Sequence, residues 1–225
     1  MIELQKVTKN YKLDGEDFAA LENINLKIKE GEFATIVGPS GCGKSTLMHI
    51  IGLLDDPSTG SITIFGKDVT KLSDNEVSRI RNHFIGFIFQ QFNLINKLTV
   101  LENILLPVQY YRKKLDFDPK ARALALMDRF EIKDKANSLP NKLSGGQQQR
   151  VAITRALINN PKIILADEPT GNLDSKTGAK ILTLLRQLNH KDHLTVIIVT
   201  HDLTIAAVSP RKIQMLDGKI IKDVS

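Results

Sequence analysis

Residues 33–46 read Phe33-Ala34-Thr35-Ile36-Val37-Gly38-Pro39-Ser40-Gly41-Cys42-Gly43-Lys44-Ser45-Thr46. The first part is apolar and β-branched, which predicts a short buried strand. The glycine-rich part that follows has the phosphate-binding pattern G-x-x-x-x-G-K-[ST] and should lead into a helix. Its glycines let backbone N–H groups converge on phosphate oxygens, and a helix N-terminus favours negative charge. The succession of strand, loop and helix predicts a nucleotide-phosphate site, against the plainer alternative of a glycine-rich turn.

The loop residues have distinct expected roles at a bound nucleotide. We expect Lys44 to bridge the β- and γ-phosphates, as a binding and catalytic residue, and the Ser45 hydroxyl to ligate Mg²⁺. The predicted nucleotide-binding set in this loop is Gly38, Pro39, Ser40, Gly41, Cys42, Gly43, Lys44, Ser45 and Thr46. Cys42 is the single cysteine, which excludes an intrachain disulfide and fits a reducing cytoplasm. We interpret it as a small residue in a variable loop position rather than as a reactive thiol.

The size and composition of the chain fit a globular α/β protein. A length of 225 residues allows one large domain or two small ones, and 42% hydrophobic with 25% charged residues is ordinary. The formal charge of +6 fits scattered surface cations, phosphate ligands or an anionic membrane face. No run of five like charges occurs, so a nucleic-acid-binding tail is not expected. Signal-peptide features and membrane-spanning apolar runs are also missing from the sequence.

Strand and helix patterns alternate along most of the chain. The first third predicts strands at 3–8, 21–28, 32–37 and 61–65, a helix over 43–54, a short helix after Ser73 and a buried strand at 85–89. From residue 162 we expect a strand at 163–166, a helix at 175–188, a strand at 195–199, a short helix, and strands near 213–216 and 219–223. Between these parts, residues 91–152 have no strand pattern, and Asp118-Pro119 begins a helix that reaches residue 130. A helical insert therefore interrupts an α/β core with a mostly parallel sheet.

Polar residues follow three further predicted strands. Gln90 follows the strand at 85–89, Asp167 and Glu168 follow the strand at 163–166, and His201 follows the strand at 195–199. Asp167 could hold Mg²⁺ through water, and Glu168 could activate the attacking water. Each alone has an ordinary alternative, a helix cap for the carboxylates and a satisfied polar residue for Gln90 or His201. Because ligands lie beyond the carboxyl ends of parallel strands, we expect the whole set to converge on one sheet edge.

The helical insert carries a second glycine-rich segment, Leu143-Ser144-Gly145-Gly146-Gln147. Ser144 is a candidate helix N-cap, and the glycines allow the backbone to approach an anion closely. An ordinary capped helix explains the same residues about equally well. If the segment binds phosphate, it need not face the loop at 38–46 of its own chain.

In this order and company, the motifs resemble those of the ATP-binding-cassette (ABC) family over essentially the whole chain. They are the loop at 38–46, Gln90, the 143–147 signature, Asp167-Glu168, Asn172-Leu173-Asp174 and His201. The resemblance implies an α/β fold with a RecA-like P-loop NTPase core, an antiparallel β subdomain and an inserted α-helical subdomain. It predicts a single ABC ATPase domain over 1–225, with 1–90 and 153–225 as the core and 91–152 as the helical subdomain.

The resemblance also assigns roles around ATP. Two copies would pair head to tail, so that Ser144, Gly145, Gly146 and Gln147 of one copy cap the ATP held by Lys44 of the other. Gln90 would contact the nucleotide and Mg²⁺ and take part in catalysis, Asp174 would lie in the loop that links the two sites, and His201 would contact the γ-phosphate. Tyr11 would stack on adenine, although a plain surface tyrosine is the alternative.

A closer similarity lies in Gly52-Leu53-Leu54-Asp55, in residues 85–94 and in residues 102–107. These resemble the subgroup that serves lipoprotein release, macrolide export and antimicrobial-peptide resistance. The resemblance implies an ATPase on the inner face of the cell membrane that drives a separate integral membrane subunit, with no nucleic acid. A nucleic-acid-associated ABC ATPase is the main alternative, and a nucleotide-binding module without turnover is another. The apolar residues of 92–98 would contact the membrane subunit, unless they are buried against the insert.

Overall fold

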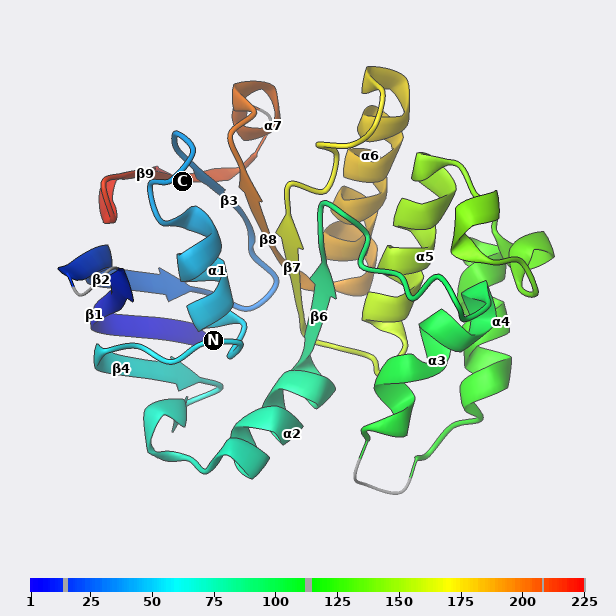
Figure 1. Cartoon of the computed structure of the whole chain (residues 1–225), viewed down its shortest axis with the longest axis horizontal. Helices are drawn as coiled ribbons and strands as arrows, with labels where there is room; N and C mark the ends of the chain where they lie inside the picture. The colour runs from blue at the N-terminus through cyan, green and yellow to red at the C-terminus, as the bar shows by residue number, and fades with distance from the viewer. Residues whose placement is uncertain (14–15, 112–114, 208, 225) are drawn as a thin grey trace. The chain divides into compact units, whose positions relative to one another are not determined.

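The computed structural model describes the chain except residues 14–15, 112–114, 208 and 225. It divides into two compact units, the first made of Met1–Ser78 with Thr195–Ser225 and the second of Arg79–Leu194. Figure 1 shows the course of the chain, with the first unit containing both termini. The helix α2, Asp74–Phe84, begins in the first unit and ends in the second.

The first unit begins with an antiparallel sheet in the order β2-β1-β4-β5. Its strands are β1 (Ile2–Leu13), β2 (Glu16–Ile28), β4 (Thr59–Ile64) and β5 (Lys67–Asp68). Buried and exposed residues alternate along the second half of β2, so that Ile24, Leu26 and Ile28 all face the core. This sheet corresponds to the predicted antiparallel part, and the β1–β2 hairpin extends further than the predicted strands because its two arms pair out to Leu13 and Glu16.

The same unit holds the parallel strands that carry the glycine-rich loop. Strand β3 (Phe33–Val37) lies between β8 (Thr195–Thr200) and β9 (Arg211–Leu216), parallel to both. Strand β10 (Lys219–Val224) pairs antiparallel with β9. Every residue of β3 and β8 is buried, as expected for strands covered on both faces. Helices α1 (Lys44–Ile51) and α7 (Leu203–Ala207) follow β3 and β8, with a short 3-10 turn at Val69–Lys71.

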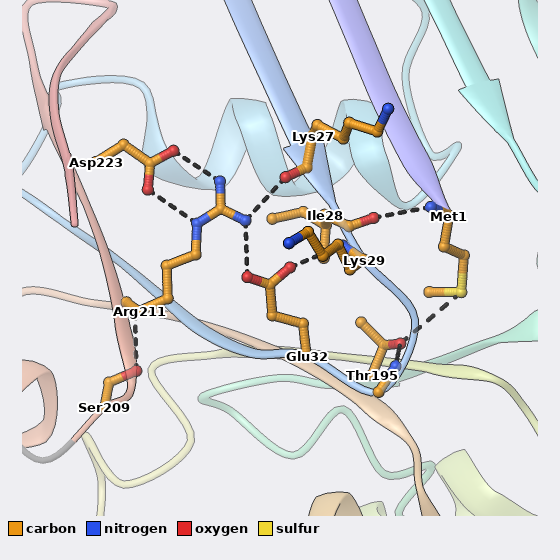
Figure 2. Close-up of polar contacts among 10 residues, drawn as sticks. Met1, Lys27, Ile28, Lys29, Glu32, Thr195, Ser209, Arg211 and Asp223 are labelled. Carbon is orange, nitrogen blue, oxygen red and sulfur yellow. Dashed lines mark hydrogen bonds and ion pairs between the residues drawn. The ribbon is translucent and has the colours of Figure 1, made fainter. Parts of the chain in front are cut away.

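The N-terminal end of β3 is held by a half-buried arginine, shown in Figure 2. Arg211, the first residue of β9, donates to Glu32 at 2.8 Å and to both carboxylate oxygens of Asp223 on β10. Its guanidinium also donates to the carbonyl oxygen of Lys27 at 2.8 Å. These bonds raise the pKa of Arg211 further above its usual value, with Asp223 as the main cause. The cluster fixes the turn before β3 and therefore the strand that carries the glycine-rich loop at its other end.

The second unit combines a strand pair with helices. Strands β6 (Ile85–Ile88) and β7 (Ile163–Asp167) run parallel, with Ile88 opposite Ala166. The helices are α3 (Val100–Gln109), α4 (Pro119–Arg129), α5 (Gly145–Leu157) and α6 (Ser175–Asp192), with 3-10 turns at Lys133–Lys135 and Pro140–Lys142. Helices α3, α4 and α5 contact one another. Figure 1 shows them as the green and yellow-green helices. The predicted helical insert at 91–152 falls wholly within this unit.

Side-chain caps explain where these helices begin. Asp118 accepts from the N–H groups of Lys120 and Ala121 and precedes Pro119, as predicted from that dipeptide. Thr99 forms a capping box with Glu102 at the start of α3. That helix was not predicted, although the Thr99-to-Glu102 spacing is the same signal that located the helix after Ser73.

Among the residues that the structure describes, no helix is long and apolar enough to cross a membrane.

Candidate nucleotide site

The glycine-rich loop connects β3 to α1, and two of its glycines cannot be replaced without a clash. A Cβ on Gly38 would lie 2.3 Å from the carbonyl oxygen of Met215, and one on Gly43 would lie 2.4 Å from that of Ala20. Gly43 also has a φ of 96°, in the left-handed region. The close approach of neighbouring backbone therefore requires glycine here and fixes the curvature of the loop.

Helix α1 begins at this loop without a side-chain cap. Its N-cap is Gly43, which makes no side-chain hydrogen bond to the first turn. The N–H groups of a first turn need partners outside the helix, and an anion can supply them. Lys44 is almost buried, and its ammonium group donates to the carbonyl oxygens of Gly38 and Pro39, both at 2.8 Å. Amide donors and an enclosed cation thus face the same small volume, which is the arrangement that a polyphosphate requires.

A pocket of about 190 Å³ adjoins this loop. It is lined by Tyr11, Phe18, Ala20, Gly41, Gly43, Lys44, Ser45 and Thr46. Tyr11 and Phe18 are register partners on β1 and β2, so the hairpin brings both rings to the pocket. Phe18, with 48% of its surface exposed, was not predicted from the sequence. Only the strand register shows that it lies opposite Tyr11.

Tyr11 is held in position by a hydrogen bond from its hydroxyl group. The hydroxyl donates to Asp55 at 2.7 Å, and the same carboxylate pairs with Lys9 at 2.6 Å. Burial, together with the bond to Asp55, raises the pKa of the Tyr11 hydroxyl above its usual value. The ring is therefore a neutral, fixed surface beside the pocket.

His201 follows β8 and lies near the start of the glycine-rich loop. Together with Gly38 and Pro39 it lines a second pocket, of about 560 Å³. The other walls come from α7 and from the β9–β10 hairpin, including Leu203, Lys212 and Lys222. The first unit by itself thus brings His201, the loop and Tyr11 to one end of the β3–β8 strand pair.

In the second unit, Gln90, Asp167 and Glu168 come at the carboxyl ends of the paired strands β6 and β7. The side-chain amide of Asn172 donates to the carbonyl oxygen of Gln90 at 2.9 Å. A Cβ on Gly171 would lie 2.7 Å from the Gln90 side chain. The turn after Glu168 therefore packs directly on Gln90, and the two strand ends form one group.

The signature segment lies at the start of α5 in this same unit. Ser144 and Gln147 form a capping box, with the N–H of Ser144 donating to Gln147 at 2.9 Å. A Cβ on Gly146 would lie 2.6 Å from the Thr177 side chain, so this glycine allows α5 to begin close to α6. Asp174 caps α6 by accepting from the N–H of Thr177 at 3.0 Å, and the Thr177 bonds lower the pKa of Asp174. Ser144 and Asp174 are both exposed, so this surface is open to another molecule.

The site residues predicted from the sequence thus form two groups, one in each unit. The first contains Tyr11, residues 38–46 and His201, and the second contains Gln90, residues 144–147, Asp167, Glu168 and Asp174. Among the described residues, no cluster of three or more His, Cys, Asp or Glu side chains could hold a metal ion. Mg²⁺ usually takes only one or two protein oxygens beside substrate phosphates. The Ser45 hydroxyl and the Asp167 carboxylate have the oxygen chemistry that fits it.

Comparison with known proteins agrees with this geometry. A family model described as ABC transporter matches residues 21–171. An uncharacterized ABC transporter ATP-binding protein of Methanocaldococcus jannaschii is 53% identical over 226 residues, covering 99% of this chain and 96% of the relative. A dimeric ATP-binding cassette solved in a post-hydrolysis state, bound to ADP and Pi, has a TM-score of 0.91 and 50% identity over 99% of this chain and 97% of its own.

A further relative is a longer protein. The macrolide export ATP-binding/permease protein MacB of Chlorobaculum tepidum is 45% identical over 223 residues, which cover 99% of this chain and 34% of MacB. The chain therefore spans about a third of that relative. The family model, the identities and the shared fold lead to one conclusion. This chain belongs to the ABC transporter family, as one of its ATP-binding ATPase cassettes.

Proposed function

We propose that this protein hydrolyses ATP as a head-to-tail homodimer and drives a separate membrane subunit in export or release. The observation that carries the nucleotide assignment is the uncapped start of α1, with the Lys44 ammonium group enclosed by its own loop. Residues 38–46 bind the phosphates, and Tyr11 supplies a face for adenine. Residues 1–90 and 153–225 act as the core, and residues 91–152 as a helical subdomain that carries the cap for the other copy.

Magnesium is the cofactor that this site would use. Ser45 and Asp167 would hold the ion, with Gln90 as a further oxygen donor. When bound, Mg²⁺ supplies charge neutralisation at the phosphates. The protein's own part is to orient the attacking water through Glu168 and to contact the γ-phosphate through Lys44 and His201.

The dimer is supported by the open surface around Ser144, and it can be tested with mixed subunits. Lys44→Ala removes the phosphate contact, and Ser144→Arg places a bulky side chain at the exposed start of α5. If each site uses Lys44 from one copy and Ser144 from the other, a mixed dimer has one site with both changes and one intact site. Mixing the two inactive variants should therefore restore part of the ATPase activity, measured as phosphate release.

Subunit exchange must be shown in the same sample, for example with two differently labelled variants. Ser144→Arg also removes a helix cap, which costs about 1 kcal/mol, so its melting temperature is compared with that of the wild type. Absence of any recovery despite exchange and intact folding would contradict the shared site.

We place the membrane subunit on the segment after Gln90. Ile95 is exposed, and Phe92, Leu94 and Leu98 are half-buried. The backbone of this segment is held from the helices: Arg155 on α5 donates to the carbonyl oxygen of Phe92 at 2.8 Å, and Asn103 on α3 accepts from the N–H of Ile95 at 2.7 Å. Burial lowers the pKa of Arg155 to about 10, so this cation is enclosed against the loop carbonyls. A fixed backbone that leaves Ile95 exposed and three further apolar side chains half-buried suits a docking surface.

Changing Leu94 and Ile95 together to Asp tests this docking site. The segment's backbone bonds do not depend on those side chains, so the variant should stay folded and bind ATP. It should fail to co-purify with the membrane subunit, because two carboxylates replace the apolar contact. Ile221→Asp is the matched control, since Ile221 is also exposed, at 53%, but lies on β10. An unfolded double variant would mean that the residues belong to the core, and normal assembly would mean that the partner docks elsewhere.

A further inference from the structure

Gln149 is a buried amide that the roles above do not use. It lies on α5, five positions after the cap residue Ser144, and none of its surface is exposed. Its side-chain NH₂ group donates to the carbonyl oxygen of Pro169 at 2.7 Å. A carbonyl oxygen can only accept, so the NH₂ end of the amide must face Pro169 and the orientation is unambiguous. The contact joins the signature helix to the residue directly after Glu168.

The other end of this amide indicates what the residue is for. The Gln149 side-chain oxygen is buried and accepts no hydrogen bond from the described part of the chain. Leaving a buried acceptor unpaired opposes folding. Farther along α5, after the half-buried Arg150, Val151, Ala152 and Ile153 are fully buried apolar residues. An apolar side chain would fill the same space without that cost, so the NH₂ donor is the property that distinguishes Gln149 from its neighbours.

The backbone that receives this bond is unusual. Glu168 has a φ of 44°, in the left-handed region that residues with a Cβ rarely adopt. Its carbonyl oxygen accepts from the N–H of Gly171 at 3.0 Å, which closes a turn around Pro169. A strained backbone persists only when its surroundings hold it. Pro169 is buried, and Gln149 provides a hydrogen bond to this turn from another element.

We propose that Gln149 is a positioning residue, which fixes the turn 168–171 and thereby aims the Glu168 carboxylate. This inference rests on the proposed role of Glu168 in activating water. Helix α5 then has two roles. Its first residues cap the nucleotide bound by the other copy, and Gln149 holds the turn 168–171 of its own chain. Because Gln149 bonds to Pro169, the position of Glu168 depends on the position of α5.

The test is Gln149→Met, which keeps the length and volume of the side chain and removes both polar atoms. The variant should lower kcat roughly 10- to 100-fold, since misplacing a catalytic group by about 1 Å has an effect of that size. KM for ATP should stay within about twofold, because the change leaves residues 38–46 and Tyr11, which bind the nucleotide in the proposed function, unaltered. The melting temperature should change by less than about 4 °C, since the unpaired oxygen is lost together with the hydrogen bond.

Asn159→Leu is the matched control. Asn159 is also a buried amide in the second unit with an unpaired side-chain oxygen, but its NH₂ group donates to the carbonyl oxygens of Asn82 and Pro107. Its replacement should leave kcat unchanged below the melting transition, whatever its effect on the melting temperature, because its hydrogen-bond partners are Asn82 and Pro107 rather than the turn after Glu168. A merely structural role for Gln149 predicts that Gln149→Met behaves in this same way.

Glu168→Gln is measured beside these variants to separate the two hypotheses. If Glu168→Gln is inactive and Gln149→Met keeps kcat within twofold of the wild type, the positioning role is wrong and the role of Glu168 stands. If Glu168→Gln itself turns over at the wild-type rate, the proposed function of Glu168 fails first. Should Gln149→Met not fold, Gln149→Leu replaces it, and failure of both to fold would show that Gln149 is needed for folding and overturn the proposal.

Discussion

Replacing Glu168 with glutamine should lower ATP turnover by about 10²–10⁴-fold, the usual contribution of a general base. Glu168 follows the buried strand β7, next to Asp167, and its backbone is in the left-handed region with a φ of 44°. Glutamine has the same shape and the same backbone preferences at this position, so the change removes the proton acceptor and little else. ATP binding should be kept, since residues 38–46 are untouched.

In the proposed dimer the two copies separate only after hydrolysis, so the variant should also accumulate as an ATP-bound dimer. Phosphate release, a nucleotide titration and size-exclusion chromatography with ATP measure the three expected effects. Glu131→Gln is the matched control, since Glu131 also has a positive φ, 57°, and its exposed carboxylate pairs with Arg150. Wild-type turnover by Glu168→Gln would rule out the assignment of the base.

Replacing Lys44 with alanine should weaken ATP binding and stop hydrolysis. The Lys44 ammonium group is nearly buried and bonds to the carbonyl oxygens of Gly38 and Pro39, so it is fixed where the loop can receive phosphate. A hydrogen bond to a charged group contributes about 1.5–3 kcal/mol, which predicts a loss of roughly 10- to 100-fold in affinity. Turnover should fall further, since the transition state carries charge at the same oxygens.

Nucleotide titration measures the ATP affinity of Lys44→Ala, and phosphate release measures its turnover. Lys67→Ala is a suitable control, because Lys67 is an exposed cation in the same unit and its ion pair with Glu76 is long, at 3.8 Å. If Lys44→Ala binds and hydrolyses ATP as the wild type does, the glycine-rich loop is not the phosphate site.

Local signals in the sequence located most elements. The apolar run at 33–37 and the glycines after it predicted β3 and the start of α1, and the apolar pattern of the neighbouring strand β8 was equally plain. Asp118 and Ser144 gave the starts of α4 and α5 from their side-chain caps. These features depend on residues within a few positions of one another, so a single sequence contains them.

Local sequence patterns could not predict contacts between residues that are far apart in the chain. Phe18 reaches the pocket because it is the register partner of Tyr11, and Arg211 reaches Glu32 across 179 positions. The hydrogen bond from the Gln149 side chain to the carbonyl oxygen of Pro169 links two residues that are 20 positions apart. In the sequence Gln149 is one of three consecutive glutamines, and nothing local distinguishes it from Gln148.

The sequence by itself predicted the chemistry proposed for this protein, because the glycine-rich loop, the carboxylates after β7 and the signature at α5 are each recognised from the types and spacing of nearby residues. Only the tertiary structure decided which backbone groups hold those residues in place. It showed that Gly38 and Gly43 are required by the carbonyl oxygens of Met215 and Ala20, and that the turn after Glu168 is tied to α5. The physical reason is that hydrogen bonds and close backbone approach are set by distance in space, which the order of residues along the chain does not fix.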